Sequence, residues 1–223
     1  IKPVFLFPPK PVALFKWLFH FPNGFLWPWA TLHILITYFS YLYFVPNINA
    51  GLSFNFDWIA IIFIRNFVIL FVYTGLWHFW LYNLKAQKND FRYNIKPLGK
   101  GKQWLFGSQT RENMFWSLFS AVPIWTGYEV LLWWSFANGY ILFPINDWLS
   151  NPIYFFFILA ATPLWQHFHF YLTHRLTHWK PLYKWVHYLH HKNINPGPWS
   201  GLSMHPIEHI LYLSNVLIFF IIP

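Results

Sequence analysis

Long apolar runs constrain this chain more than any other feature of its sequence. A helix that crosses a bilayer needs about 20 largely apolar residues. Only 9% of the residues are charged, against about 25% in a typical soluble domain. The sequence therefore predicts an all-α, polytopic helical membrane protein with about four full spans and the start of a fifth. The predicted spans are 25–45, 58–84, 115–137 and 152–173, and the fifth run covers 206–222.

The basic residues lie on alternate sides of these runs. They occur in 1–24, in 85–114 and after the fourth run, whereas 46–57 and 138–151 contain none. Because cytoplasmic loops are enriched in Lys and Arg, the three basic regions are expected in the cytosol. The chain is therefore predicted to have three parts. Residues 1–24 are an interfacial lead-in, in which prolines interrupt long helices. Residues 25–165 are a transmembrane helical region with a basic cytosolic loop, 85–114, and residues 166–223 are a histidine-rich region.

Composition excludes several classes of protein. The chain has no cysteine, which excludes disulfides, thiolate ligands and thiol catalysis. The net charge of +9 raises the question of a nucleic-acid partner, but the basic residues lie between apolar runs and form no basic domain, so we expect none.

Two charged residues, Arg65 and Glu129, lie inside predicted spans, where charges usually face other helices. For Arg65, a structural pair and a functional role are equally compatible with the sequence.

Histidine is concentrated in one stretch after the fourth run. Nine of the twelve histidines lie in 167–209, together with a single acid, Glu208. Histidine is the commonest neutral metal ligand, and residues four apart share one face of a helix. Three groups in the stretch contain such a pair: HRLTH (His174, His178), HYLHH (His187, His190, His191) and HPIEH (His205, His209).

The first two groups predict a metal centre with His174, His178, His187, His190 and His191 as ligands. The third group is ambiguous, so His205, His209 and also His169 are candidates for ligands or for residues that hold the ligands. Without cysteine, zinc-ribbon and iron–sulfur sites are excluded, and H-E-x-x-H is absent. The six acids are too scattered to bridge metals. An all-nitrogen site suits Fe, Zn, Cu or Ni.

The spacing of these groups resembles that of the fatty acid hydroxylase/sterol desaturase superfamily. HRLTH, an eight-residue spacer WKPLYKWV, HYLHH and MHPIEH are similar to that family's histidine boxes. SQTRENMFWS and HPIE resemble C-5 sterol desaturases in particular. The resemblance implies a non-haem di-iron centre on the cytosolic face of a helical membrane domain, and O2-dependent oxidation of an unactivated C–H bond in a lipid. It also implies an electron donor such as cytochrome b5 or ferredoxin.

The chain departs from that pattern in one respect. The family's last histidine box is missing before Pro223, so we expect further ligands beyond it, and a chain that alone binds metal poorly and is inactive. His205 is a ligand, a partner of a ligand or a helix-start residue. Glu208 is a partner of a histidine, a partner of Arg175 or an interfacial acid.

The predicted function is a membrane-bound di-iron desaturase or hydroxylase acting on a sterol or fatty-acyl lipid. The expected location is the endoplasmic reticulum in a eukaryote or the inner membrane in a bacterium. The alternative is a histidine-rich membrane protein that binds or transports metal, although a transporter would place its ligands near mid-membrane. The basic loop 85–114 either docks an electron-transfer protein or reflects topology alone.

Overall fold

A computed structural model describes residues 2–21, 23–90, 92, 94–141 and 151–221. Within these residues every regular element is helical, and the only β contacts are two isolated bridges. The predicted all-α fold is therefore confirmed. The chain forms two compact units, residues 1–45 and residues 46–223.

The first unit contains three helices: η1 (Pro3–Phe5), α1 (Pro11–Phe19) and α2 (Trp29–Phe44). Proline is favourable at the first helical position, where its missing N–H has no partner to lose, and Pro11 begins α1 there. The predicted span 25–45 is shortened to the 16 residues of α2. The reason is a turn before Pro28, in which the amides of Phe25 and Leu26 donate back to carbonyls of α1.

The second unit begins with η2 (Ile48–Leu52) and the long helix α3 (Phe56–His78), which continues as the π-helix η3 (Phe79–Asn83). Among the described residues, Phe56–Asn83 is the one helix that is long and apolar enough to cross a membrane. Its length follows from a largely apolar sequence without proline, in which the polar residues Arg65 and Asn66 are buried. This helix corresponds to the predicted second span.

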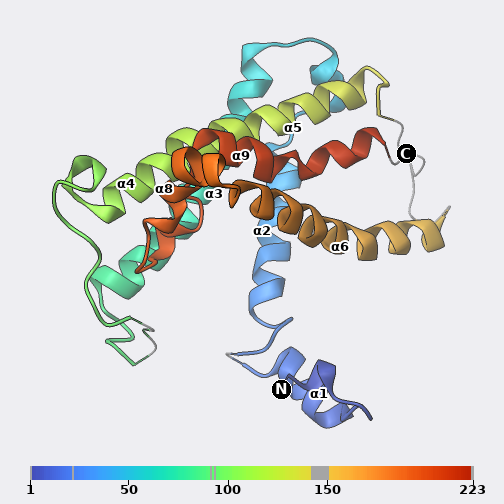
Figure 1. Cartoon of the computed structure of the whole chain (residues 1–223). Helices are drawn as coiled ribbons and strands as arrows, with labels where there is room; N and C mark the ends of the chain where they lie inside the picture. The colour runs from blue at the N-terminus through green and yellow to red at the C-terminus, as the bar shows by residue number, and fades with distance from the viewer. Residues whose placement is uncertain (1, 22, 91, 93, 142–150, 222–223) are drawn as a thin grey trace. The chain divides into compact units, whose positions relative to one another are not determined.

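The rest of the second unit is a series of helices, most of them short (Figure 1). Their bounds are η4 (Leu105–Gly107), α4 (Gln109–Trp116), η5 (a π-helix, Ser117–Ala121), α5 (Val122–Ala137), α6 (Pro152–Thr177), α7 (Lys180–Leu182), η6 (a π-helix, Tyr183–His187), α8 (Tyr188–His191), η7 (Pro198–Ser200), α9 (Pro206–Leu213) and η8 (Ser214–Phe220).

The predicted number of spans and their topology are not confirmed. The helix of the third predicted span begins at Gln109, inside the predicted loop 85–114, and its first turns are polar. The helix of the fourth, α6, has glutamine and several histidines in its second half. The fifth run, Pro206–Phe220, is a shorter apolar helix. In α4 and α6, helices thus continue through polar sequence in which apolarity alone predicts a loop or the end of a span.

Two contacts hold α3 against α5. Trp58, Ile62 and Val130 form a buried apolar cluster. Next to it, the Arg65 guanidinium pairs with the Glu129 carboxylate, and Asn66 on α3 donates to Thr126 and Glu129. Since a charge inside an apolar helix is costly unless it is paired, this pair answers the question about Arg65: it is a structural partner of Glu129.

A second apolar cluster fixes the segment that follows the histidine boxes. Trp199 of η7 is buried with Leu118 and Val122, and Phe67 and Leu70 of α3 pack on them. Helix α9 contacts both α5 and α6, and the three are seen together in Figure 1. The ends of α6 and α9, the helix α8 and the segment 193–200 therefore converge on one part of this unit.

Candidate metal centre

Four histidine side chains at the C-terminal ends of α6, η6 and α8 converge on one point. His174 lies in the last turns of α6, His178 follows its end, His187 closes η6, and His191 closes α8. Their ligand nitrogens all lie within 4.8 Å of one another. The Nε2–Nε2 distances are 3.2 Å from His174 to His178, 3.3 Å from His178 to His187 and 2.9 Å from His187 to His191.

These separations match the edges of a coordination shell. Imidazole nitrogens bound at about 2.1 Å to one first-row ion lie about 3.0 Å apart in octahedral and about 3.4 Å apart in tetrahedral geometry. The three neighbouring separations are therefore those expected of ligands that share one such ion. All four are imidazoles, a donor set that suits Fe, Zn, Cu or Ni and not Mg or Ca.

Glu208 orients the most buried of the four ligands. The Glu208 Oε1 atom lies 2.7 Å from Nδ1 of His187, and the two side chains are 7% and 0% exposed. Burial raises the pKa of Glu208 to about 8. In its ionised form Glu208 accepts the Nδ1 proton of His187, and the Nε2 lone pair of that ring then faces His178 and His191. A carboxylate that holds a metal-binding histidine in this way fixes the tautomer and raises the basicity of the ligand. Of the three interpretations of Glu208, the partner of a histidine is correct.

For His174, His187 and His191 the site favours the neutral imidazole, which is the form that binds metal. Burial lowers the pKa of His187 to about 3, and repulsion from His191 and His174 adds to the effect. Burial also lowers the pKa of His174 and of His191, to each of which the neighbouring His178 adds repulsion.

The other histidines singled out in the sequence lie outside the group of four. His190 stacks on His187, with ring centroids 5.7 Å apart, and its Nδ1 atom is buried without a hydrogen-bond partner. His205 caps α9 by accepting from the Ile207 amide, and His169 Nε2 lies 3.0 Å from the Ser214 hydroxyl.

His209 has partners for both ring nitrogens. Its Nδ1 atom lies 2.8 Å from the Ser120 hydroxyl, and its Nε2 atom lies 3.1 Å from the Leu202 carbonyl. The side chain is fully buried. Through these two hydrogen bonds His209 connects α9 to η5 and to Leu202, in the segment just before α9.

A row of polar side chains on α4 and η5, which we call the polar ladder, fastens the segment after the boxes. The Gln109 amide donates to Asn193 Oδ1 at 3.0 Å and to the Asn195 carbonyl at 2.8 Å. Further along, Asn113 donates to the Ser200 hydroxyl, Ser117 to the Trp199 carbonyl, and Ser120 meets His209. The ladder thus consists of Gln109, Asn113, Ser117 and Ser120, all of them buried.

Sequence reasoning gave these four residues no role. Their positions are i, i+4, i+8 and i+11, a helical repeat that runs from the predicted loop into a predicted span. That polar repeat is the signal that would have shown a helix face turned toward a polar partner. The same helix carries buried Glu112, which accepts from the Lys192 ammonium at 2.7 and 2.9 Å.

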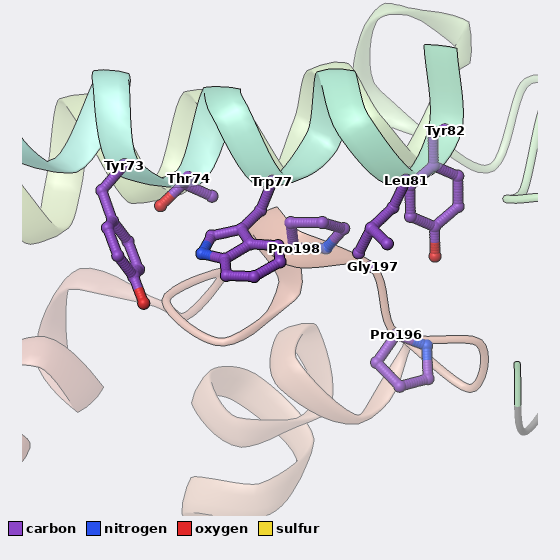
Figure 2. A pocket seen from close by; sticks show the side chains of 8 residues that line it. All are labelled: Tyr73, Thr74, Trp77, Leu81, Tyr82, Pro196, Gly197 and Pro198. Atoms are coloured by element: carbon purple, nitrogen blue, oxygen red, sulfur yellow. The ribbon is translucent and has the colours of Figure 1, made fainter. Parts of the chain in front are cut away.

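A pocket of about 350 Å3 lies where the C-terminal part of Phe56–Asn83 meets the segment after the boxes. Figure 2 shows Trp77 and Leu81 pointing from the long helix toward the turn that carries Pro198. Its walls are mostly aromatic or apolar, with a few hydroxyls. The lining residues are Tyr73, Thr74, Trp77, Leu81, Tyr82, Pro196, Gly197 and Pro198.

Comparison with known proteins matches the region that contains these histidines. Residues 157–223, which contain all four converging histidines, match the family model for fatty acid hydroxylase. The chain is 30% identical over 175 residues to a Delta(7)-sterol-C5(6)-desaturase of Nicotiana tabacum, covering 72% of this chain and 59% of the tobacco protein. The chain belongs to the fatty acid hydroxylase/sterol desaturase superfamily.

Other superfamily members match shorter stretches. Fatty acid hydroxylase domain-containing protein 2 of Macaca fascicularis is 34% identical over 91 residues, 37% of this chain and 27% of that protein. Methylsterol monooxygenase 2-1 of Arabidopsis thaliana is 40% identical over 74 residues, 32% of this chain and 25% of that protein. The chain therefore spans about a quarter to three fifths of the length of these relatives. No solved structure matches the chain significantly.

Proposed function

We propose that this superfamily member is a membrane-bound non-haem di-iron oxidoreductase that uses O2 to desaturate or hydroxylate a sterol or fatty-acyl lipid. The observation that carries the proposal is the convergence of His174, His178, His187 and His191 within 4.8 Å. The tobacco and Arabidopsis relatives are named as a sterol desaturase and a methylsterol monooxygenase, both oxidoreductases that act on sterols, which supports the proposal.

The chain's own residues supply the ligands and the shape of the site. The four converging imidazoles hold one iron, and we propose that His190, with its unpartnered buried Nδ1 atom, serves the second. Bound iron would supply the activation of O2 that a saturated C–H bond requires. Glu208 keeps the His187 Nδ1 proton in place, so that the Nε2 atom of that ring remains a ligand.

The pocket near the boxes is proposed to receive the apolar body of the lipid. The turn 196–198 that forms one wall begins five residues after His191, and the other wall belongs to the helix that is able to cross a membrane. Ligand sites of this kind combine apolar walls with a few polar groups that fix orientation. Tyr73 and Tyr82 supply hydroxyls in this pocket.

Electrons are proposed to come from an acidic carrier protein such as a cytochrome b5 or a ferredoxin. Lys100, Lys102 and Arg111 are exposed in the segment 85–114, and opposite charges on a partner would accelerate its association. We place this surface and the histidine site on the cytosolic side, because cytoplasmic segments are enriched in Lys and Arg.

The decisive experiment uses the purified full-length protein. We expect about two bound irons, as the superfamily's di-iron chemistry requires, and oxidation of a sterol or fatty-acyl lipid when O2 and a reductase system are added. His187→Ala should remove iron and activity together, whereas His167→Ala, at an exposed position of α6 outside the cluster, should retain both. Tight zinc binding without lipid oxidation would favour the alternative, a membrane protein that binds or transports metal.

The pocket has a separate test in the same preparation. Leu81→Trp adds bulk at the pocket wall and should raise KM for the lipid while the iron content stays unchanged. Leu76→Trp is the matched control, because Leu76 is 63% exposed on the same helix and does not line the pocket. Equal KM values for both variants would exclude this pocket as the lipid site.

A further inference from the structure

The short helical stretch that carries the second histidine box has two unlike faces. From Lys180 to His191 the chain is continuously helical, through α7, η6 and α8. On its inner face Val186 is 3% and His187 is 0% exposed. On its outer face the exposed residues are Lys180, Pro181, Lys184, Trp185 and Tyr188.

The exposed positions follow the helical repeat. They fall at i, i+1, i+4, i+5 and i+8, which is one continuous stripe on a helix. We call this set the basic–aromatic stripe. Trp185 is 75% exposed and Tyr188 is 57% exposed, and Trp179, just before the stripe, is 62% exposed.

The composition of the stripe is not that of a face turned to bulk water. Tryptophan and tyrosine combine an apolar ring with a polar group, and they concentrate where a membrane meets water. Lysine places its aliphatic stem along apolar surface and keeps its ammonium in the polar layer. The Lys184 ammonium lies 5.2 Å from the centre of the Trp185 ring, so the two side chains already lie together.

The charge around the stripe has one sign. Between His167 and Ile207 the sequence contains no Asp or Glu, but it contains Arg175, Lys180, Lys184 and Lys192. Of these, Lys192 is neutralised by buried Glu112, whereas no described carboxylate pairs with Lys180 or Lys184. A helix with exposed aromatic residues and unpaired lysines has the properties of one that lies in the headgroup layer of an anionic bilayer.

We propose that the basic–aromatic stripe lies in the headgroup layer of the membrane, with the rings of Trp185 and Tyr188 among the upper acyl chains and the ammonium groups of Lys180 and Lys184 at anionic lipid phosphates. The stripe binds the lipid surface and not a protein partner, because its aromatic rings need an apolar layer that an acidic soluble carrier does not offer.

This placement brings the metal centre to the membrane surface. His191, an exposed member of the four-histidine cluster, follows inner-face His187 by four residues and Tyr188 of the stripe by three, so it lies at the edge between the inner face and the stripe. An α-helix with its side chains is about 10–12 Å across. The exposed side of the cluster is therefore within about one helix diameter of the headgroups. The link to a lipid substrate rests on the proposed function, but the position of the stripe does not.

The experiment measures depth in the bilayer with nitroxide labels on the full-length protein in nanodiscs that contain phosphatidylcholine and phosphatidylserine. Residues 1–223 contain no cysteine, so each introduced cysteine carries the one label in this stretch once any cysteine elsewhere in the full-length protein is replaced by serine. Trp185→Cys and Tyr188→Cys report on the stripe. Ile64→Cys, in the middle of the long apolar helix and 59% exposed, is the lipid control, and Lys102→Cys, in an exposed polar loop, is the water control.

We expect labels at 185 and 188 to collide with O2 in preference to a water-soluble nickel complex, with a ratio between those of positions 64 and 102. Labels as accessible to nickel as position 102 would overturn the proposal. So would labels that become protected only when an acidic electron-transfer protein is added.

A second test leaves Trp185 in place and changes the two lysines of the stripe instead. Lys180→Glu/Lys184→Glu with the label at 188 should shift that label toward water, whereas Lys100→Glu/Lys102→Glu should leave it unchanged. An identical shift, or no shift, in both would overturn the role of the two lysines. Because the label reports depth and not catalysis, a stripe at the expected depth in a protein without iron or oxidase activity would refute the proposed function alone.

Discussion

Removing the Glu208 carboxylate should weaken metal binding without unfolding the protein. Glu208 holds the Nδ1 atom of His187 at 2.7 Å, and both side chains are nearly inaccessible to solvent. A hydrogen bond to a charged group contributes about 1.5–3 kcal/mol. At about 1.4 kcal/mol for each factor of ten, this corresponds to about a 10- to 100-fold loss of metal affinity in Glu208→Ala, which is the range found for carboxylates that hold metal-binding histidines.

Glu208→Gln separates the role of charge from that of shape. The amide oxygen still accepts from Nδ1 of His187, so the ring stays oriented and only the effect of the negative charge is lost. We therefore expect a loss for Gln smaller than that for Ala. Asp90→Asn removes an exposed acid from the loop 85–114 and should leave affinity unchanged.

The assay is competition for iron against a chelator, with the visible spectrum of the cobalt-substituted protein as a second measurement. Histidine ligation gives a spectrum that depends on the number and geometry of the nitrogens, so Glu208→Ala should change it even at saturating metal. Circular dichroism checks that each variant remains helical. If Glu208→Ala binds iron as tightly as the unaltered protein and has the same cobalt spectrum, the argument that this carboxylate orients His187 is wrong.

Three further results are expected. Arg65→Met leaves Glu129 without its partner between α3 and α5 and should lower the free energy of unfolding by about 2 kcal/mol. The loss is smaller than the 3–5 kcal/mol of a fully buried pair because Glu129 is 26% exposed. Unfolding in detergent measures this loss, and an unchanged midpoint would contradict it. Asn113→Ala removes the bond to Ser200 and should lower hydrogen-exchange protection across 193–200 but not in α3. Metal-free protein should lose stability as pH falls from about 6.5 toward 3, because His187 takes up a proton in the unfolded chain well before it does in the folded one; His187→Gln should flatten that part of the pH profile.

Local periodicity was sufficient to predict the core of the site. Pairs of histidines four residues apart lie on one helix face, and the structure brings His174 with His178 and His187 with His191 to one point. The same periodicity does not specify which way neighbouring positions point. His190 belongs to the same box, yet its ring lies outside the group of four.

Contacts between distant segments were beyond sequence reasoning. The partner of Glu208 lies 21 residues away in the chain, and the sequence offered a histidine, an arginine and the membrane surface with equal weight. The predicted number of spans was not confirmed, for a related reason. Apolarity was counted along the chain, whereas the helix that begins at Gln109 is stabilised by polar partners 84 and 86 residues away.

The polar ladder has a consequence for the order of events during biosynthesis. Ser117 and Ser120 meet their partners across 82 and 89 residues, and contacts this distant in sequence form late because a long loop must close first. On a ribosome the ladder helix is complete long before the segment that it clamps has been made. His187 and His191 are also made before Trp199 and Glu208, which fix their surroundings. The four histidines therefore reach their final positions only once the segment that the ladder clamps has been made.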